Sequence, residues 1–363
     1  MTIIACIILI FTFLQMLVAL INLFAERNLP ESGNKSDELV SVLIPARNEE
    51  INIGNILTDL KNQDYRKLEI MVYNDQSEDK TVEIVKGFAR DDDRIRLIES
   101  DGLPEGWLGK NYACHRLSEN AKGRYLMFLD ADVRLGNRLI DNAVAFADRH
   151  NTGLISIFPK QIIVTPGEKI TVPNMNFILV SLLPLIFVRK LKFPSLAAAN
   201  GQFMFFRKDV YRNILPHELM KKSMIEDISI AREFKKRGLK IACLLGDENI
   251  TCRMYNGFSA AVNGFSKNVI EFFGGSFLTA LLFWLVTTFG FLAILFTLPQ
   301  LFFVIYIFSY LLIRIFVSAA SHQNIFHNII FIIPLQFSLG IFIYKAFINK
   351  IYRKFQWKGR NIE

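Results

Sequence analysis

Hydrophobic and polar positions follow two different regimes along this chain of 363 residues. Between residues 40 and 150, short apolar runs alternate with segments whose apolar residues recur at helical spacing. The pattern predicts strands at Val40–Ile44, Leu68–Tyr73, Arg94–Glu99 and Arg124–Leu129, and helices at Glu49–Asn62, Ser77–Arg90, Gly109–Ala121 and Asn137–His150. Such alternation is typical of an α/β fold in which helices flank a mostly parallel sheet.

The C-terminal third is apolar in a different way. From Phe272 to Tyr344 the only charged residue is Arg314, and this stretch of 73 residues holds 15 of the 33 phenylalanines. One bilayer crossing takes about 20 apolar residues. We therefore expect a C-terminal transmembrane helical bundle with up to three spans, at about residues 276–298, 299–320 and 325–344.

Two further apolar runs complete the pattern. Residues 3–24 lack the basic n-region and the small-residue cleavage site of a signal peptide, so we expect an uncleaved N-terminal transmembrane anchor. Residues 177–188 are too few to span a bilayer, contain Pro184 and are followed by Arg189 and Lys190. They favour a helix at about 170–190 that lies in the membrane interface, with a buried helix of the soluble domain as the alternative.

These patterns divide the chain into four parts. We expect an anchor (1–25), an α/β domain (26–271), a transmembrane region of two to three spans (272–345) and a basic tail (346–363). Six basic residues, of the formal net charge of +8, stand near the C-terminus against one acidic residue: Lys345, Lys350, Arg353, Lys354, Lys358 and Arg360, against Glu363. Basic residues next to a span favour the cytoplasmic side and anionic lipid, so we expect no nucleic-acid partner.

Topology is left open by these expectations. If the α/β domain and the tail are both cytoplasmic, an even number of C-terminal spans must separate them, yet three segments are candidates. Either one segment is re-entrant or interfacial, or the tail is external. The charge distribution favours a multi-pass protein of the cell (plasma) membrane with a cytoplasmic α/β domain.

Acidic residues follow the predicted strands. The first strand runs into PARNEE, the second into NDQSED and the fourth into DADV. Ligands of such sheets bind beyond the carboxyl ends of the strands, where Glu49, Asp75, Asp130 and Asp132 would gather. Asp130 and Asp132 could hold Mg²⁺ or Mn²⁺ and leave positions for phosphate oxygens.

The motifs SVLIPARNEE, VYNDQSEDKT, FLDADV and MIEDISIAREFKKRGLKIA resemble glycosyltransferase family 2, which has the GT-A fold. GLPEGWLGKNYAC, CRMYNGFSAAVNGFSKN and the terminal WKGR are similar to its membrane-bound lipid branch, which includes the hopene-associated and carotenoid-acid glycosyltransferases.

The resemblance implies a role for each matched residue. Pro45, Glu49 and Asp75 would border the nucleotide of a nucleotide-diphosphate sugar, and Asp132 and Asp130 would hold the metal on its diphosphate. Lys110 would neutralise phosphate charge or order the loop, and Arg253, where processive members carry an arginine, would bind the nucleotide sugar. Asp227, with Glu226, would lie at the acceptor and act as general base.

The chain departs from the family pattern at two places. Gln76 stands where the family usually has a glycine, so we expect that this turn needs no positive φ. The QxxRW motif of processive members is absent, because Arg253 is followed by Met254 and Tyr255.

The resemblance therefore implies an inverting transfer of a sugar, with UDP-hexose as the expected donor. The acceptor would be a lipid such as a carotenoid acid or hopanoid. A processive polysaccharide synthase or a polyprenyl-phosphate sugar transferase is the alternative.

Overall fold

The computed structural model describes residues 1–25, 27–32, 36–352, 356–357 and 360–361. Its centre is a seven-stranded sheet with the order β3-β2-β1-β4-β8-β6-β9. The strands are β1 (Val40–Ala46), β2 (Leu68–Asn74), β3 (Ile95–Glu99), β4 (Tyr125–Leu129), β6 (Leu154–Phe158), β8 (Phe203–Arg207) and β9 (Ile241–Leu245). Only β8 runs antiparallel to its neighbours β4 and β6, so the prediction of a mostly parallel sheet is confirmed.

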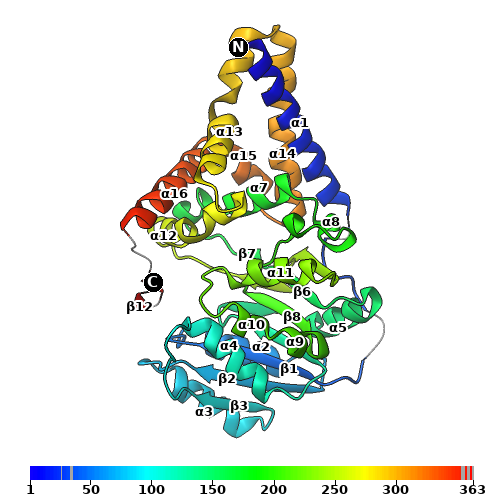
Figure 1. Cartoon of the computed structure of the whole chain (residues 1–363), viewed down its shortest axis with the longest axis vertical. Coiled ribbons are helices and arrows are strands. Elements are labelled where there is room, and N and C mark those ends of the chain that lie inside the picture. The colour runs from blue at the N-terminus through cyan, green and yellow to red at the C-terminus, as the bar shows by residue number, and fades with distance from the viewer. Residues whose placement is uncertain (26, 33–35, 353–355, 358–359, 362–363) are drawn as a thin grey trace.

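Helices cover both faces of this sheet (Figure 1). One face packs against α2 (Ile53–Lys61), α3 (Thr81–Asp91) and α5 (Leu139–His150), and the other against α4 (Gly109–Asn120), α9 (Lys208–Ile214) and α11 (Glu226–Lys236). Strand β4 shows why both faces need cover. Its side chains alternate between the two cores, Tyr125, Met127 and Leu129 on one side and Leu126 and Phe128 on the other.

The four predicted strands and four predicted helices of this region are all present, with shifted boundaries. The helix expected from Glu49 begins at Ile53, and the one expected from Ser77 begins at Thr81. Side-chain hydrogen bonds hold the preceding residues in turns, because Thr81 Oγ1 accepts from the backbone N–H of Glu49 at 2.8 Å.

A small second sheet borders the first. It consists of β5 (Val133–Leu135), β10 (Ile250–Cys252) and β7 (Lys160–Gln161), in that order. Because β5 begins directly after Asp132, this sheet extends the chain from the carboxyl end of β4. It thereby brings residues near 160 and 252 to the same edge of the molecule.

Four described helices are long and apolar enough to cross a membrane: α1 (Thr2–Phe24), α13 (Phe277–Thr297), α14 (Gln300–Ala320) and α16 (Ile332–Tyr352). Helices α1, α13 and α14 rise together to a tip far from the sheet, whereas α16 lies lower, beside α12 (Phe258–Asn268) (Figure 1). The segment expected as one span at 325–344 is two helices, α15 (Ile325–Ile330) and α16.

The segment expected at the membrane interface forms two short helices. These are α7 (Pro173–Leu182) and α8 (Leu185–Lys190), and the chain is extended at Pro184 between them. Every residue of α7 from Pro173 to Ser181 is buried, and the helix contacts α1, α14 and α16. Helix α7 is therefore enclosed beneath the apolar bundle.

The remaining described elements are short. They are α6 (Pro166–Lys169), η1 (Pro194–Leu196), α10 (Pro216–Leu219), η2 (Val269–Phe273), β11 (Gln356–Trp357) and β12 (Arg360–Asn361). Of the tail residues named above, Arg353, Lys354, Lys358 and Glu363 lie outside the described residues.

Candidate active site

Lys110 joins the two acidic motifs of the predicted site. It lies in the first turn of α4, and its Nζ is 2.7 Å from Asp130 Oδ1, at the end of β4. The same Nζ is 3.6 Å from Glu226 Oε1, at the start of α11. Three segments that are distant in the sequence thus meet at one ammonium group.

Asp227 is oriented by the backbone. Its Oδ2 accepts a hydrogen bond from Gly201 N at 2.9 Å, and its Oδ1 accepts one from Ile228 N at 2.8 Å. Gly201 precedes β8, and a Cβ there would lie 3.1 Å from Lys110 Nζ and 3.2 Å from Glu226 Oε1. The missing side chain therefore leaves space for the Lys110–Glu226 pair.

Burial shifts the proton equilibria of this acidic pair. It raises the pKa of Glu226 to about 7, with Lys110 acting against the rise and Asp227 adding to it. Burial also raises the pKa of Asp227, against the hydrogen bond from Ile228 and the charge of Lys110. For Lys110, burial lowers the pKa, but the charges of Asp130 and Glu226 outweigh it and hold the group protonated.

Asp132 has an oxygen that lacks a partner. Its Oδ1 is buried without a hydrogen bond. Burial, with the charges of Asp130 and Glu49, raises the pKa of Asp132 to about 6. An unpartnered buried carboxylate oxygen beside a second carboxylate fits a divalent cation, which would relieve both the desolvation and the repulsion. Among the described residues no group of three or more His, Cys, Asp or Glu could hold a metal, so further ligands would have to come from substrate or water.

The residues expected at the nucleotide lie at the paired ends of β1 and β2. Pro45 is opposite Tyr73 in the parallel register, and Asp75, which is buried, donates its N–H to Ala46 O at 2.8 Å. Glu49 accepts a hydrogen bond from Asn52 Nδ2 at 2.9 Å. The negative charge of Glu49 contributes to the raised pKa of Asp132.

The turn at Gln76 differs from the expectation. Gln76 has φ of +54°, so the expectation that this turn avoids positive φ is wrong. Hydrogen bonds hold the turn: Arg47 Nη1 donates to Gln76 O at 3.2 Å, and Ser77 N donates to Asn74 Oδ1 at 2.9 Å. Such contacts stabilise a left-handed conformation that is costly for a non-glycine residue.

Arg253 has a carboxylate partner outside the cluster. Its Nη2 donates to Glu168 Oε1 at 2.9 Å. Glu168 is fully buried, and it also accepts from Val164 N at 2.7 Å and from Gly257 N at 3.0 Å. In the described part of the chain, no ion pair joins Arg253 to the carboxylates around Lys110.

Two residues of this arrangement were not predicted from the sequence: Gly201 and Glu168. The Asn200–Gly201 dipeptide before the apolar run FMFFR is a turn signal, but it does not show which side chain the turn contacts. Thr165 and Glu168 form a capping box at α6, and its S/T-x-x-E spacing is visible in the sequence.

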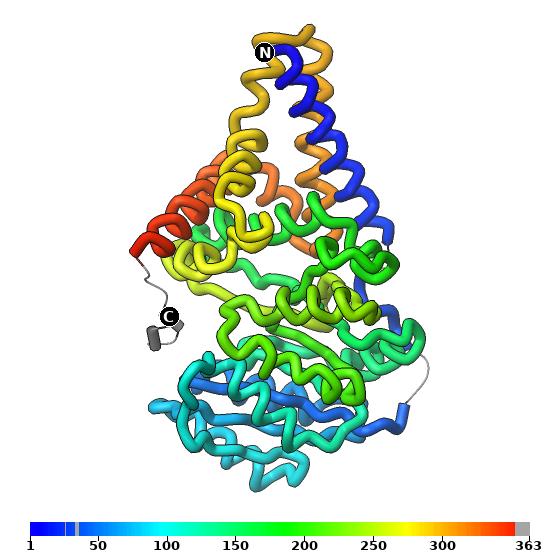
Figure 2. The backbone as a smooth tube through the Cα atoms, in the orientation of Figure 1, coloured from blue at the N-terminus to red at the C-terminus, as the bar shows by residue number. Residues whose placement is uncertain are grey.

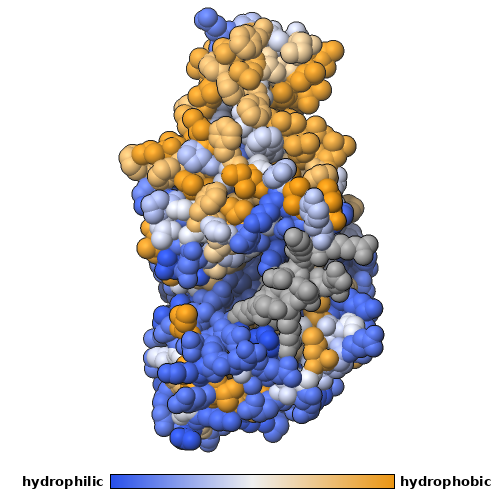
Figure 3. Space-filling view, turned by 90° about the vertical axis from the view of Figure 1, so that its left-hand side faces the viewer, coloured by the Kyte–Doolittle hydropathy of each residue, from blue (hydrophilic) through white to orange (hydrophobic). Residues whose placement is uncertain are grey.

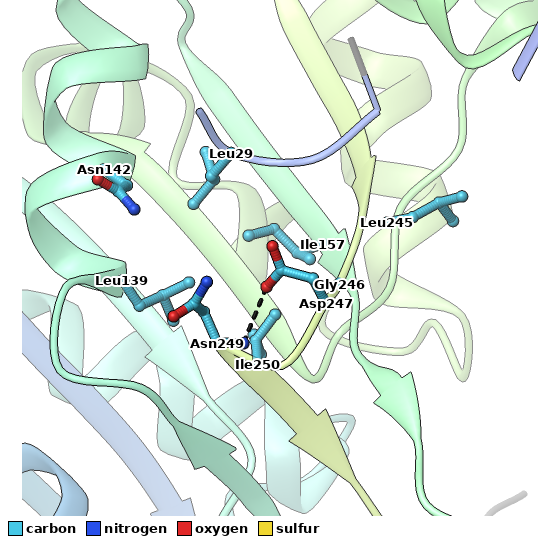
Figure 4. A pocket seen from close by; sticks show the side chains of 9 residues that line it. All are labelled: Leu29, Leu139, Asn142, Ile157, Leu245, Gly246, Asp247, Asn249 and Ile250. Carbon is cyan, nitrogen blue, oxygen red and sulfur yellow. Dashed lines mark hydrogen bonds between the residues drawn. The ribbon is translucent and has the colours of Figure 1, made fainter. Parts of the chain in front are cut away.

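A small pocket lies elsewhere, between α5 and the strands β6 and β9 (Figure 4). Leu29, from the segment after α1, covers it, and its one carboxylate, Asp247, accepts from Asn249 N at 2.8 Å. None of the predicted site residues lines this pocket, so it is separate from the carboxylate cluster.

Comparison with known proteins shows that this chain is similar to sugar-transferring enzymes. Residues 41–215 match the family model described as glycosyl transferase family 2. A mannosyltransferase from Pyrobaculum calidifontis, solved with GDP-Man and Mn²⁺, is similar with a TM-score of 0.59 and 16% identity, over 97% of this chain and 99% of that one. The fold is therefore of the GT-A type.

Curated relatives give a finer comparison. A 4,4'-diaponeurosporenoate glycosyltransferase of Staphylococcus haemolyticus is 29% identical over 65% of this chain and 62% of its own length. The protein of the same name from Staphylococcus aureus strain USA300 is 24% identical over 69% and 67%. The matched part thus spans just under two thirds of the first relative. The chain is therefore similar to glycosyltransferases of family 2 over residues 41–215.

Proposed function

We propose that this protein is a membrane-bound inverting glycosyltransferase that moves a sugar from a nucleotide-diphosphate sugar to a lipid acceptor. The observation that carries the proposal is the convergence of Asp130, Glu226 and Lys110, with Asp227 beside them, at the carboxyl end of the sheet. A donor-side and an acceptor-side carboxylate are thus joined within one cluster.

Asp227, with Glu226, is the proposed general base. Inverting transfer requires that the acceptor oxygen lose its proton as it attacks the anomeric carbon. A carboxylate whose pKa is raised by burial is a better proton acceptor than one in water. The hydrogen bonds to Gly201 N and Ile228 N fix the Asp227 carboxylate in one orientation. An α-linked donor would then give a β-glycoside.

Asp132 and Asp130 are the proposed ligands of Mg²⁺ or Mn²⁺. The unpartnered Asp132 Oδ1 supports this assignment. When bound, such a cation neutralises charge on the leaving diphosphate. Lys110 adds a fixed positive charge at the same edge, 2.7 Å from Asp130 Oδ1.

The donor would be UDP-hexose, bordered by Pro45, Glu49 and Asp75, with Asp75 reading the base edge. The mannosyltransferase of similar fold was solved with GDP-Man, which supports the sugar-nucleotide class. Arg253 is assigned to the donor as well. To bind the donor directly, Arg253 would have to release Glu168. Otherwise it would act by positioning α6 and α12.

The acceptor would be a carotenoid acid or hopanoid, because the curated relatives are named for a carotenoid acid. If the reacting group of the acceptor is a carboxylate, it is already deprotonated, so little base catalysis by Asp227 is needed. The four apolar helices support a lipid acceptor and a membrane location. The basic residues near the C-terminus favour the plasma membrane with the catalytic domain in the cytoplasm. A processive polysaccharide synthase or polyprenyl-phosphate sugar transferase would retain the same donor chemistry.

Mass spectrometry of lipids from cells with and without the protein tests the proposal. We expect one lipid whose mass increases by a single sugar, and we expect purified enzyme to make it from UDP-hexose only when Mg²⁺ or Mn²⁺ is present. Asp132→Ala should abolish formation of that product. Asp64→Asn, at an exposed carboxylate, is the matched control. A polymeric product would identify a synthase instead.

Asp227→Asn separates the acceptor types. With a hydroxyl acceptor we expect turnover to fall at least about 100-fold, the usual contribution of a general base. Full turnover with a hydroxyl acceptor would contradict the assignment of Asp227 as the base.

A further inference from the structure

Asn111 joins the first turn of α4 to the chain that follows α10. Its side chain is only 1% exposed, and its Nδ2 donates to Met220 O at 2.8 Å, to Ser223 O at 3.0 Å and to Lys221 O at 3.4 Å. These carbonyls belong to one short turn, in which Ser223 N donates to Met220 O at 2.8 Å. A single buried amide group therefore binds the whole turn.

The chain just before α4 contacts the same turn. Leu108 N donates to Lys221 O at 2.9 Å, and Lys221 Nζ lies 5.9 Å from the centre of the Trp107 ring. Gly106 has φ of +79°, and a Cβ there would lie 3.2 Å from Lys222 Cε. Together with the bonds of Asn111, these contacts form a clamp between residues 106–111 and 220–223. Figure 2 shows α4 and the chain after α10 side by side, although they are distant in sequence.

The clamp adjoins the carboxylate cluster at both of its ends. On α4, Asn111 directly follows Lys110, whose Nζ is 3.6 Å from Glu226 Oε1. On the other segment, Ser223 precedes Glu226 by three residues, and Ser223 Oγ accepts from Ile225 N at 3.3 Å. A shift of the turn would therefore shift the start of α11, which carries Glu226 and Asp227.

The ion pair between Lys110 and Glu226 does not fix this geometry alone. Its N–O distance of 3.6 Å is longer than a usual N–H···O hydrogen bond, which is at most about 3.2 Å. An ammonium group on a flexible stem attracts a carboxylate without a strict direction. The amide of Asn111, by contrast, makes directional bonds at 2.8 Å and 3.0 Å to backbone atoms.

We propose that Asn111 is a positioning residue of the transfer reaction. By holding residues 220–223 against α4, it keeps Glu226 and Asp227 in the place relative to Lys110 that the transfer requires. Because Asn111 acts through the proposed base, this role rests on the proposed function and deepens it.

Two variants separate the donor group of Asn111 from its volume. Asn111→Leu fills the site without a donor, and Asn111→Asp keeps the shape but replaces the N–H donors by oxygen. The same two substitutions at Asn120 are the matched controls. Asn120 is exposed at the end of the same helix, where its Nδ2 donates to Arg116 O at 2.9 Å.

Hydrogen–deuterium exchange of the full chain in detergent measures the clamp without substrate. The clamp lies in the α/β domain below the apolar bundle, in the part of the molecule whose surface is mainly hydrophilic (Figure 3). In both Asn111 variants we expect residues 220–229 to exchange about 10-fold faster, because local opening costs less once these hydrogen bonds are lost. The Asn120 variants should exchange like the wild type. Unchanged exchange in both Asn111 variants, or faster exchange throughout the chain, would overturn the proposal.

Steady-state kinetics then test whether the clamp serves the reaction. In both Asn111 variants we expect kcat to fall about 10- to 100-fold, because small displacements of reacting groups cost that much. The KM for the nucleotide sugar should stay within about 2-fold, because the lost placement concerns the transfer step. Wild-type kcat in Asn111→Asp would mean that only volume matters at this position and would overturn the proposal.

Two further outcomes distinguish this role from the proposed function. Faster exchange at residues 220–229 with unchanged kcat would overturn the positioning role and leave the proposed function intact. Absence of sugar transfer by the wild-type chain would refute the proposed function instead. The exchange measurement needs no substrate, so it still decides whether Asn111 holds the turn.

Discussion

Lys110 determines the charge state of the residues around it. Its ammonium is within 4 Å of one carboxylate from β4 and one from α11, and its charge lowers the pKa of both Glu226 and Asp227. Removing that charge must therefore raise both pKa values and leave more of the proposed base protonated at neutral pH.

The variant Lys110→Met should shift the ascending limb of the pH profile of kcat/KM to higher pH. At pH 7 we expect a loss of up to about 10-fold for each pKa unit of the shift, because the deprotonated fraction falls by at most that factor. Lys110→Arg, which keeps the charge, should shift the limb less. Lys122→Met, at an exposed lysine, is the control, and an unshifted profile in Lys110→Met would contradict the role of this charge.

At the scale of residues, the position of a side chain could be predicted where it follows directly from local order in the sequence. Asp130 and Asp132 could be predicted because they follow an apolar strand of an α/β pattern. Gly201 could not, because its N–H reaches Asp227 only through tertiary packing between the loop before β8 and α11. The expectation that Gln76 needs no positive φ was wrong for a related reason, because hydrogen bonds made by other residues stabilise this turn.

At the scale of elements, α6 has a larger role than its four residues suggest. Glu168 caps α6 and also binds Arg253 and the N–H of Gly257, at the start of α12. Burial alone would raise its pKa, but these and the neighbouring hydrogen bonds outweigh it and lower the pKa to about 2. The ionised carboxylate thus joins two helices that are distant in sequence.

The variant Glu168→Gln should lower the free energy of unfolding by about 2 kcal/mol, the usual contribution of a hydrogen bond to a charged group. Because the folded pKa is depressed, the wild-type advantage should be complete above about pH 5 and should shrink as pH falls toward 2. Thermal unfolding from pH 7 to pH 3.5 measures this difference. Glu83→Gln, at an exposed carboxylate, is the control, and a difference independent of pH would contradict the role of the charge.

Helix α7 shows that amino-acid composition alone does not predict the environment of a helix. The apolar run 177–188, which covers the end of α7 and part of α8, predicted contact with an apolar phase. A sequence does not show whether that phase is lipid or protein. Polar side chains made the difference, because Asn174 binds α16, and Gln15 of α1 binds Ser181 at 3.1 Å. These bonds place α7 inside the protein.

At the scale of the molecule, a buried asparagine of α1 binds the backbone of the α7–α8 segment. Asn22 Nδ2 donates to Val180 O and Leu183 O at 2.8 Å each, and its Oδ1 accepts from Leu185 N at 2.8 Å. The side chain thereby satisfies backbone groups where α7 ends and α8 begins.

The variant Asn22→Ala should lower the free energy of unfolding by about 2 kcal/mol, because it leaves buried backbone groups without partners. Thermal unfolding in detergent, with activity retained after heating as a second measure, checks this expectation. Leu17→Ala changes a side chain of the same helix that is 43% exposed. Equal effects of the two variants would show that Asn22 contributes no specific attachment.

The enclosure of α7 also determines how the catalytic half can be isolated. A fragment of residues 26–271 would keep α7 but lose α1, α14 and α16, which cover it. The apolar side chains of Phe177, Ile178 and Val180, now buried, would then face water, and exposed patches of this kind promote aggregation. Crystallisation would therefore need α1, α14 and α16 to be kept with the α/β domain, in detergent or nanodiscs.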